Sequence, residues 1–508
     1  MNTHKTIESV EKLSFLGLEV RKEKKTIALC HGVFDLLHPG HFEHFRAASE
    51  LADIVVVSVT SDKYVNKGPG RPVFNLQTRM KTLSYLNTID YVVASDFSDA
   101  SQVLHALKPN FYVKGNDYSD LSSDVTGKIE VEAQIVEAHG GQLVFTNEIT
   151  SSSTSLINEF MSSFEPEVKN WIQDFKQKHS IDEINSYLNR ISELNVGLLG
   201  EVIIDVYSDC KALAKSSKDP LLAFHLGETR VYPGGILAIE NNCKSWASKV
   251  SLFTAVGEDF TSRDLFKNMS VEKENWSVFK STQNPTIVKH RYVDIDSNTR
   301  LFETYEYSQN DYDEKTLSNL QRELKNQELE LDLLIVADYG HGLMTKKLVN
   351  EITNLIPFIA VNTQANAGNR GFNTITKYQR ADLISLNGSE LQLELRDTTP
   401  NYAKIVPQYM QKMQASFAVL TLGAGGLMVF DKSGDSTLVP AFATKVVDKV
   451  GAGDSVLSIA SLLARVHAPI SIIGFIASIV AAHEVGQLGH KSSLSKVDLK
   501  KTVKGMLG

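Results

Sequence analysis

Residues 31–41 read His31-Gly-Val-Phe-Asp-Leu-Leu-His38-Pro-Gly-His41 and follow the apolar run 27–30. The apolar run predicts a buried strand, and the Pro-Gly pair predicts the turn into a helix. Because His38 and His41 are three residues apart, they face the same side of that helix. The N–H groups at a helix start attract anions, and two imidazoles can donate hydrogen bonds to the charge that grows on a departing pyrophosphate. The stretch therefore predicts a catalytic triphosphate site, with a plain structural turn as the alternative.

The residues around this stretch continue a strand-helix pattern. An amphipathic run at 42–51 precedes a second apolar strand at 54–59. Gly32 lets a phosphate approach the backbone closely, and we assign Gly32 and Phe34 to nucleotide binding. The alternation predicts an α/β domain with a Rossmann-like parallel sheet.

Further blocks carry cations or hydroxyls that suit phosphate. A loop with Gly and Pro holds Lys67, and Arg79 begins the next helical run, so both are candidates to neutralise a phosphate. Solvated surface charge is the alternative. Lys114 follows an apolar strand, at the edge where open α/β sheets bind ligands. A block of hydroxyls, which also suits a helix cap, is assigned to the nucleotide: Ser153, Thr154 and Ser155.

Residues 1–158 resemble the cytidylyltransferase-like nucleotidyltransferases, and within them the adenylyltransferase half of the bifunctional heptose-phosphate kinase/adenylyltransferases. The resemblance implies that His38, His41, Lys67 and Arg79 bind the triphosphate while a sugar phosphate attacks. ATP is the implied nucleotide, with CTP as an alternative because both kinds of enzyme carry His-x-Gly-His. The blocks beyond the histidine motif are Ser61-Asp62, Lys67-Gly-Pro-Gly-Arg71-Pro-Val73, Gln77-Thr-Arg-Met80, Val113-Lys-Gly-Asn-Asp-Tyr118 and Ser152-Ser-Thr-Ser155.

Length and composition are typical of a globular enzyme. The chain has 508 residues, too many for one core, with 42% apolar residues, 22% charged residues and a net charge of −8. A negative net charge disfavours nucleic-acid and anionic-membrane surfaces. Three cysteines without paired spacing indicate neither a disulfide framework nor a zinc site. The polar N-terminus and the short apolar run 470–482 predict no membrane span, so we expect a cytoplasmic homo-oligomer that acts on small molecules.

The sequence pattern divides the chain into three parts. Residues 1–158 form the predicted nucleotidyltransferase domain. Residues 159–194 are charged, with apolar residues at helical spacing, and predict a helical linker. A new α/β pattern begins at residue 195 and predicts a second domain over 195–508.

The stretch Val446-Val-Asp448-Lys-Val-Gly451-Ala452-Gly453-Asp454 indicates the chemistry of the second half. Small residues before a predicted helix let successive N–H groups converge on one point, which makes an anion hole for a phosphoryl group in transfer. Asp454 can take a proton from a sugar hydroxyl. A tight turn with an N-cap aspartate is the alternative. No Walker-type Gly-x-x-x-x-Gly-Lys-Ser/Thr motif competes with this site.

Residues 195–495 resemble the ribokinase-like carbohydrate kinases, whose fold is an α/β/α sandwich with a small lid, and within them the kinase half of the same heptose enzymes. The motifs are Pro233-Gly-Gly235, Gly257-Glu-Asp259, Ala337-Asp-Tyr-Gly-His-Gly342, Asn387-Gly-Ser-Glu390, Thr421-Leu-Gly-Ala-Gly-Gly426 and Gly486-Gln-Leu-Gly489. The resemblance implies MgATP as the phosphoryl donor and Asp454 as the base. Lys289 and Arg291 lie in a strand-like stretch that suits a lid, with an exposed strand face as the alternative. The implied contacts are Asp205, Gly234, Gly235, Asn242, Lys289 and Arg291 for the sugar, Thr421, Gly423, Gly426, Gly451, Ala452 and Gly453 for the nucleotide, and Asn387 and Glu390 for Mg²⁺ through water.

The second half also departs from the family pattern. Ala238 stands where the heptose kinases have an asparagine, so one sugar contact is missing. Asn362-Thr363-Gln364 stands where they have Asp-Pro-Lys, which removes an aspartate and a lysine from the phosphate region. The order of the two halves is the reverse of the familiar one.

The sequence predicts an enzyme with two activities. One half phosphorylates a sugar phosphate, with heptose 7-phosphate at C1 as the implied substrate. The other joins a sugar 1-phosphate to a nucleotide and releases pyrophosphate. The alternatives are a cytidylyltransferase and kinase for another sugar or polyol phosphate, and a nucleotidyltransferase whose kinase half is a non-catalytic sensor.

Overall fold

A computed structural model gives the fold of the chain as two compact units. It describes residues 5–7, 9–65, 71–115, 128–146, 164–216, 219–261, 275–353, 355–369, 371–489 and 492–508. The first unit groups residues 1–164 with 497–508, and the second is residues 165–496. The domain limits 1–158, 159–194 and 195–508 stay a prediction. Within the described ranges, no helix combines the length and the hydropathy that a membrane crossing needs.

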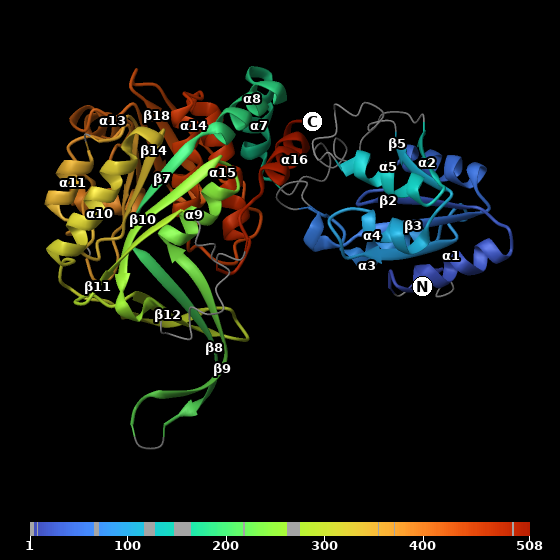
Figure 1. The fold of residues 1–508 in the computed structure, drawn as a ribbon, viewed down its shortest axis with the longest axis horizontal. Coiled ribbons are helices and arrows are strands. Elements are labelled where there is room, and N and C mark those ends of the chain that lie inside the picture. Colours follow the sequence, from blue (N-terminus) through green and yellow to red (C-terminus); the bar gives the residue numbers. More distant parts are fainter. Residues whose placement is uncertain are drawn as a thin grey trace. The chain divides into compact units, whose positions relative to one another are not determined.

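The first unit is built on a parallel sheet (Figure 1). Among its described residues, six strands pair in the order β1-β4-β3-β2-β5-β6, and every pair is parallel. The strands are β1 Thr6–Ile7, β2 Ile27–Gly32, β3 Ile54–Thr60, β4 Tyr91–Ser95, β5 Phe111–Gly115 and β6 Gln142–Thr146, and the helices are α1 Lys12–Lys22, α2 Pro39–Leu51, α3 Leu76–Ser84, α4 Ser101–Leu107, α5 Lys128–Ala138 and, across the boundary at residue 496, α16 Lys496–Leu507.

The central strand β2 is buried on both faces. Ala28 and Cys30 pack into one apolar cluster, and Ile27 and Leu29 pack into another. Successive residues of a strand point to opposite faces, so both faces of the sheet are covered, as in doubly wound α/β folds. The predicted buried strand and the predicted α/β class are confirmed.

The second unit contains a larger sheet. Within the described residues it has nine strands in the order β11-β10-β7-β14-β15-β16-β17-β18-β19. The pairs from β11 to β17 are parallel, and β18 and β19 add antiparallel strands at one edge. The strands are β7 Asn195–Gly200, β10 Lys249–Gly257, β11 Trp276–Ser281, β14 Leu333–Asp338, β15 Ile359–Thr363, β16 Leu383–Asn387, β17 Phe417–Thr421, β18 Leu427–Asp431 and β19 Ser436–Val439.

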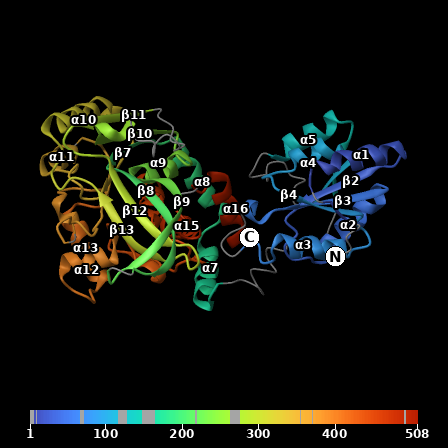
Figure 2. The same cartoon turned by 90° about the horizontal axis from the view of Figure 1, so that it is seen from below.

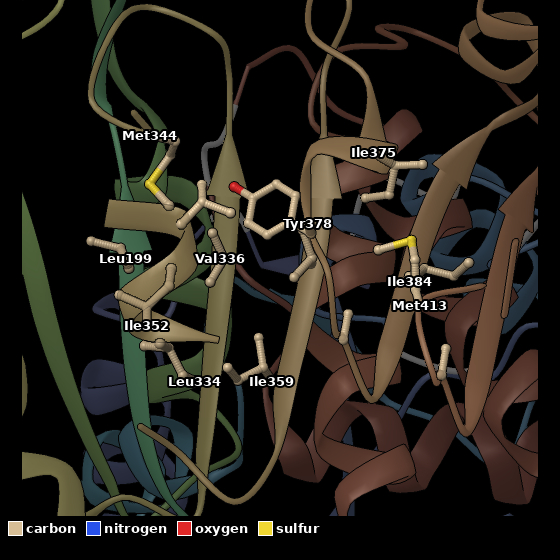
Figure 3. Packing of buried hydrophobic residues seen from close by; sticks show 14 of the residues in the cluster. Leu199, Leu334, Val336, Met344, Ile352, Ile359, Ile375, Tyr378, Ile384 and Met413 are labelled. Carbon is tan, nitrogen blue, oxygen red and sulfur yellow. The ribbon is translucent and has the colours of Figure 1, made fainter. Parts of the chain in front are cut away.

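Helices cover both faces of this sheet. One face packs against α10 to α13 in a continuous apolar cluster, part of which is shown in Figure 3 around Leu199, Val336 and Ile352. On the other side, α9, α14 and α15 lie against the sheet (Figure 1). The helices are α7 Pro166–Lys178, α8 Ile181–Arg190, α9 Ile236–Lys244, α10 Glu314–Gln327, α11 Lys346–Ile352, α12 Gly388–Leu395, α13 Tyr402–Lys412, α14 Ala452–Arg465 and α15 Ile470–Val485.

A separate mixed sheet forms the predicted lid. Its described strands run in the order β13-β12-β8-β9 and lie side by side in Figure 2. The strands are β8 Val202–Lys215, β9 Leu222–Gly235, β12 Ile287–Asp294 and β13 Arg300–Glu306. The first nine residues of β8 are buried and its last five are exposed, so the β8–β9 hairpin begins in the protein interior and ends in solvent (Figure 1).

Candidate functional site

The two histidines of the opening motif lie at the start of α2, directly after the turn that leaves β2. His38 is the N-cap residue of α2, and His41 is in its first turn. Their ring centroids are 4.0 Å apart, which agrees with the prediction that they face the same side. The ring of Phe34 meets His41 edge-on at 5.5 Å and packs against Phe45 at 5.2 Å. The aromatic contacts therefore hold the imidazoles beside the helix N-terminus, where an anion is stabilised.

Asp35 ties the next loop to this turn. Its carboxylate accepts the N–H groups of Val73 and Phe74, both at 2.9 Å. Arg71 lies 3.3 Å from the same carboxylate, and both side chains are almost wholly buried. The loop that was predicted to close over a phosphate is thus anchored at 71–74. Lys67 lies outside the described residues, as do Ser153, Thr154 and Ser155.

Arg79 is buried, which rules out the alternative of solvated surface charge. The residue is only 2% exposed. Its guanidinium donates to the carbonyl oxygens of Phe74, Val33 and Thr60 and to the Asp62 carboxylate. These acceptors come from the ends of β2 and β3 and from the loop before α3. Arg79 therefore holds the edge of the sheet that carries the histidines.

Replacing Arg79 by Lys is expected to lower the free energy of unfolding of the first unit by about 2–4 kcal/mol, because an ammonium cannot satisfy all four acceptors of a planar guanidinium. The change is measured by urea denaturation, with hydrogen exchange of β2 and β3 used to monitor unfolding. Arg46→Lys is the matched control, since Arg46 is exposed and pairs with the exposed Glu43 and Glu50. Equal stability of the two variants would contradict the assigned role.

Lys114 lies at the carboxyl end of β5, as predicted, but its ammonium is engaged by Glu132 of α5. The two groups are 3.4 Å apart, and both are nearly buried. Glu132 also accepts the Tyr112 hydroxyl at 2.8 Å and the Ala100 N–H at 2.9 Å. Burial by itself would raise the pKa of Glu132, but the Lys114 charge and these hydrogen bonds outweigh it and lower that pKa. Lys114 is therefore held in place near the sheet edge.

In the second unit, Asp454 lies in the first turn of α14. The N-cap residue Gly451 has no side-chain cap, and the first described turn contains Ala452, Gly453 and Asp454. A Cβ added at Gly453 would meet nothing within 4 Å, so there is open space beside this residue at the helix start. The Asp454 carboxylate accepts the Tyr339 hydroxyl at 2.9 Å. The arrangement offers an anion site and a carboxylate base side by side.

The predicted sugar contacts gather on the lid sheet. Lys289 of β12 lies opposite Asp205 of β8 in the parallel register, and Arg291 forms an ion pair with Asp205 and contacts Glu303 of β13 at 3.3 Å. Lys289 and Arg291 are each 6% exposed, which rules out the alternative of an exposed strand face. A Cβ at Gly234 would collide with the Asp205 carboxylate, so a larger residue there would displace Asp205.

Electrostatics link this cluster to Asp454. Burial lowers the pKa of Lys289, while the charges of Asp205 and Asp454 act in the opposite direction. The Asp205 charge raises the pKa of Arg291 although burial opposes it. Two cations and two carboxylates therefore lie close enough to interact, a cluster that suits a substrate with a negative phosphate and hydroxyl groups.

Residues 194–497, more than half of the chain, match the model of the pfkB family carbohydrate kinases. The chain belongs to the pfkB family. Residues 29–159 match the cytidylyltransferase-like model, so a cytidylyltransferase-like domain precedes the pfkB kinase domain in this chain.

Curated relatives match the first part. A bifunctional protein HldE from Syntrophotalea carbinolica is 35% identical over 152 residues, which are 29% of this chain and 30% of that protein. HldE from Pseudomonas syringae is 34% identical over 152 residues, 30% of this chain and 31% of that protein. The match thus spans about a third of these relatives. Among solved structures, phosphofructokinase-2 from Escherichia coli with potassium is 16% identical with a TM-score of 0.48, over 62% of this chain and 99% of that chain.

In the pfkB kinase domain, Asn242 of α9 contacts the first turn of α14. Its side chain is buried, and its amide donates to the Ser455 hydroxyl at 3.0 Å. The contact joins α9 to the first turn of α14. Gly235 precedes α9 as its N-cap residue. Asn242 therefore supports the helix that carries Asp454.

Asn387 and Glu390 form a capping box at the start of α12. One Glu390 oxygen accepts the Asn387 N–H and the other accepts the Ala365 N–H. Burial raises the pKa of Glu390 to about 7. Each Glu390 oxygen has a second lone-pair direction, so Glu390 can accept a hydrogen bond from a water on Mg²⁺. The Asn387 side-chain oxygen already accepts the N–H and the hydroxyl of Ser389. Thr421 is the last residue of β17, and its hydroxyl accepts a hydrogen bond from the Asn387 side-chain amide at 3.2 Å. Gly423 and Gly426 follow in the next turn.

Two buried residues of the pfkB kinase domain escaped the sequence analysis. Asp448 accepts the Tyr207 hydroxyl at 2.8 Å and the Val450 N–H at 3.0 Å, and it pairs with Arg300 of the lid. Glu201 accepts the N–H groups on both sides of Gly340. Asp448 lies in the glycine-rich stretch, and this position in the sequence could have marked it as a functional residue. Nothing in the sequence pairs Glu201 with residues far along the chain.

Proposed function

We propose that the chain is a bifunctional enzyme of sugar-nucleotide synthesis. The pfkB kinase domain phosphorylates a sugar phosphate with MgATP, and the cytidylyltransferase-like domain joins a sugar 1-phosphate to a nucleotide and releases pyrophosphate. The observation that carries the proposal is that each domain has its own helix N-terminus with reactive side chains: the His38–His41 pair on α2 and Asp454 on α14.

In the kinase step, the sugar hydroxyl oxygen attacks the γ-phosphorus of ATP while Asp454 accepts the hydroxyl proton. The bond between the γ-phosphorus and the bridging β-phosphate oxygen breaks, and ADP leaves. The first-turn amides of α14 stabilise the charge on the transferred phosphoryl group. Lys289 and Arg291 bind the phosphate that the sugar already carries, and Asp205 orients the sugar. Asn387 and Glu390 would hold Mg²⁺ through water, and the bound ion would neutralise phosphate charge.

In the transferase step, a phosphate oxygen of the sugar 1-phosphate attacks the α-phosphorus of the nucleotide, and the bond to the pyrophosphate breaks. His38 and His41 donate hydrogen bonds to the leaving charge, with Lys67 as a further cation. Lys114, Gly32 and Phe34 lie at the sheet edge beside them. We assign Arg79 to positioning, because its donors are taken up by the carbonyl groups of the sheet edge.

The proposed substrates are heptose 7-phosphate for the kinase and ATP for the transferase, with CTP as the alternative nucleotide. Phosphorylation at C1 would give a bisphosphate, so a separate phosphatase must act before nucleotidyl transfer. The HldE relatives support this choice for the first domain. The oligomeric state is proposed to be a homo-oligomer.

The test is mass spectrometry of products from a panel of sugar phosphates with ATP or CTP, with and without an added phosphatase. ADP-heptose from heptose 7-phosphate and ATP, formed only with the phosphatase, is the expected product. A product from another sugar or from CTP would replace the substrate assignment. Absence of sugar-dependent ADP formation across the panel would favour the non-catalytic alternative for the kinase domain.

Ala238 predicts reduced efficiency on heptose 7-phosphate. It is buried in the first turn of α9, just after Gly234 and Gly235, and its methyl group cannot bond a sugar hydroxyl. A lost polar partner costs about 1–3 kcal/mol, or roughly 5- to 150-fold in kcat/KM. Ala238→Asn is expected to recover part of this factor in steady-state kinetics. An efficient wild type that gains nothing would show that another residue supplies the contact.

A further inference from the structure

Tyr339 follows β14 and reaches the predicted base from a strand that carries none of the other predicted site residues. Its hydroxyl donates to Asp454 Oδ1 at 2.9 Å, and the side chain is 2% exposed. We infer that Tyr339 is the positioning residue of Asp454, fixing the carboxylate for proton removal from the sugar; this inference rests on the proposed kinase function.

The backbone around Tyr339 is held from both sides. Glu201 Oε2 accepts the Tyr339 N–H at 3.0 Å, and Glu201 Oε1 accepts the His341 N–H at 3.1 Å. The Tyr339 carbonyl accepts the side-chain amides of Asn366 at 2.7 Å and Asn369 at 2.8 Å. The phenol is therefore delivered to Asp454 by a loop whose conformation is fixed.

Gly340 makes this loop geometry attainable. Its φ is +69°, which L side chains rarely adopt, and an added Cβ would collide with the Asn369 amide. The tight turn brings both N–H groups to the one Glu201 carboxylate. The loop is thus built to place the Tyr339 hydroxyl rather than to leave it mobile.

The protonation chemistry supports a donor role. Burial and the Asp454 charge raise the pKa of Tyr339 well above its usual value, so the phenol stays protonated and donates. A hydrogen bond to a carboxylate favours its ionised form. Lys289 of the lid and Glu390 of α12 also act on Asp454, one by attraction and the other by repulsion. Both remain when Tyr339 is changed, so a difference between variants reports the lost hydroxyl.

The test is steady-state sugar phosphorylation by the full chain as Tyr339→Phe, measured against pH at saturating Mg²⁺. We expect kcat to fall about 10-fold with little change in KM for ATP. We also expect the acid limb of the pH profile, where kcat falls as the base is protonated, to move up by about one pH unit. Tyr378→Phe is the matched control. Its phenol is equally buried, but it donates to Asp338 at 2.7 Å instead of Asp454, so its acid limb should stay in place.

A second variant guards against simple misfolding. Incorporating 3,5-difluorotyrosine at position 339 keeps the side chain's shape and makes the phenol a stronger donor, so the acid limb should move to lower pH. Unchanged limbs in both Tyr339 variants, or equal shifts in Tyr378→Phe, would overturn the positioning role. A wild type without sugar-dependent phosphorylation would instead overturn the proposed kinase function, which makes the two failures distinguishable.

Discussion

Replacing Asp454 by Asn is expected to lower sugar phosphorylation by about 10²- to 10⁴-fold, the range for loss of a general base. The amide keeps the size of the carboxylate but cannot take the hydroxyl proton. Nucleotidyl transfer from a supplied sugar 1-phosphate is expected to continue at the wild-type rate, because the histidine pair belongs to the other unit.

Both activities are measured on the same preparation, as ADP formation and as pyrophosphate release. Asp435→Asn is the control, since Asp435 lies exposed in the turn between β18 and β19 and undergoes the same chemical change. A folded Asp454→Asn enzyme that loses both activities would contradict the assignment of two separate sites.

Replacing His38 or His41 by Ala is expected to lower nucleotidyl transfer by about 10²- to 10³-fold each, the usual effect of removing a preorganised donor to a developing anion. Because the rings lie 4.0 Å apart, the two are expected to act on the same phosphate charge, and their effects should not be additive. Sugar phosphorylation is expected to persist.

His105→Ala provides the matched comparison for the histidine variants. His105 is exposed on α4 of the same unit, so its loss tests the general effect of removing a helical imidazole. Pyrophosphate release at the wild-type rate from the His38/His41 double variant would leave the motif as a structural turn.

The order of elements could be predicted because local patterns determine it. The apolar run 27–30 with its Pro-Gly turn became β2 and α2, and the glycine-rich stretch became the start of α14. Periodicity and turn residues act over short distances, so a single sequence is enough to detect them.

The environment of each charge could not be predicted in the same way. The sequence shows that Arg79 begins a helix, but its burial depends on carbonyl groups from three separate segments. Tyr339 and Asp454 lie on different elements, and only the fold brings them together. Asn242 and Ser455 likewise lie on different helices, and their hydrogen bond could not be predicted from motif spacing. Motif spacing does not encode such long-range contacts.

The residues proposed to bind the sugar and the residue proposed as the base lie on two different elements of the kinase domain. Asp205, Lys289 and Arg291 belong to the hydrogen-bonded strands β8 and β12, whereas Asp454 belongs to α14 on the large sheet. These predicted sugar contacts therefore lie together on one sheet, and the predicted base lies on a helix that packs against the other. We therefore expect a sugar hydroxyl to be aligned with Asp454 only when the sugar contacts both the lid sheet and the first turn of α14. Because a water molecule is too small to contact both elements, we expect slow ATP hydrolysis while no sugar is bound.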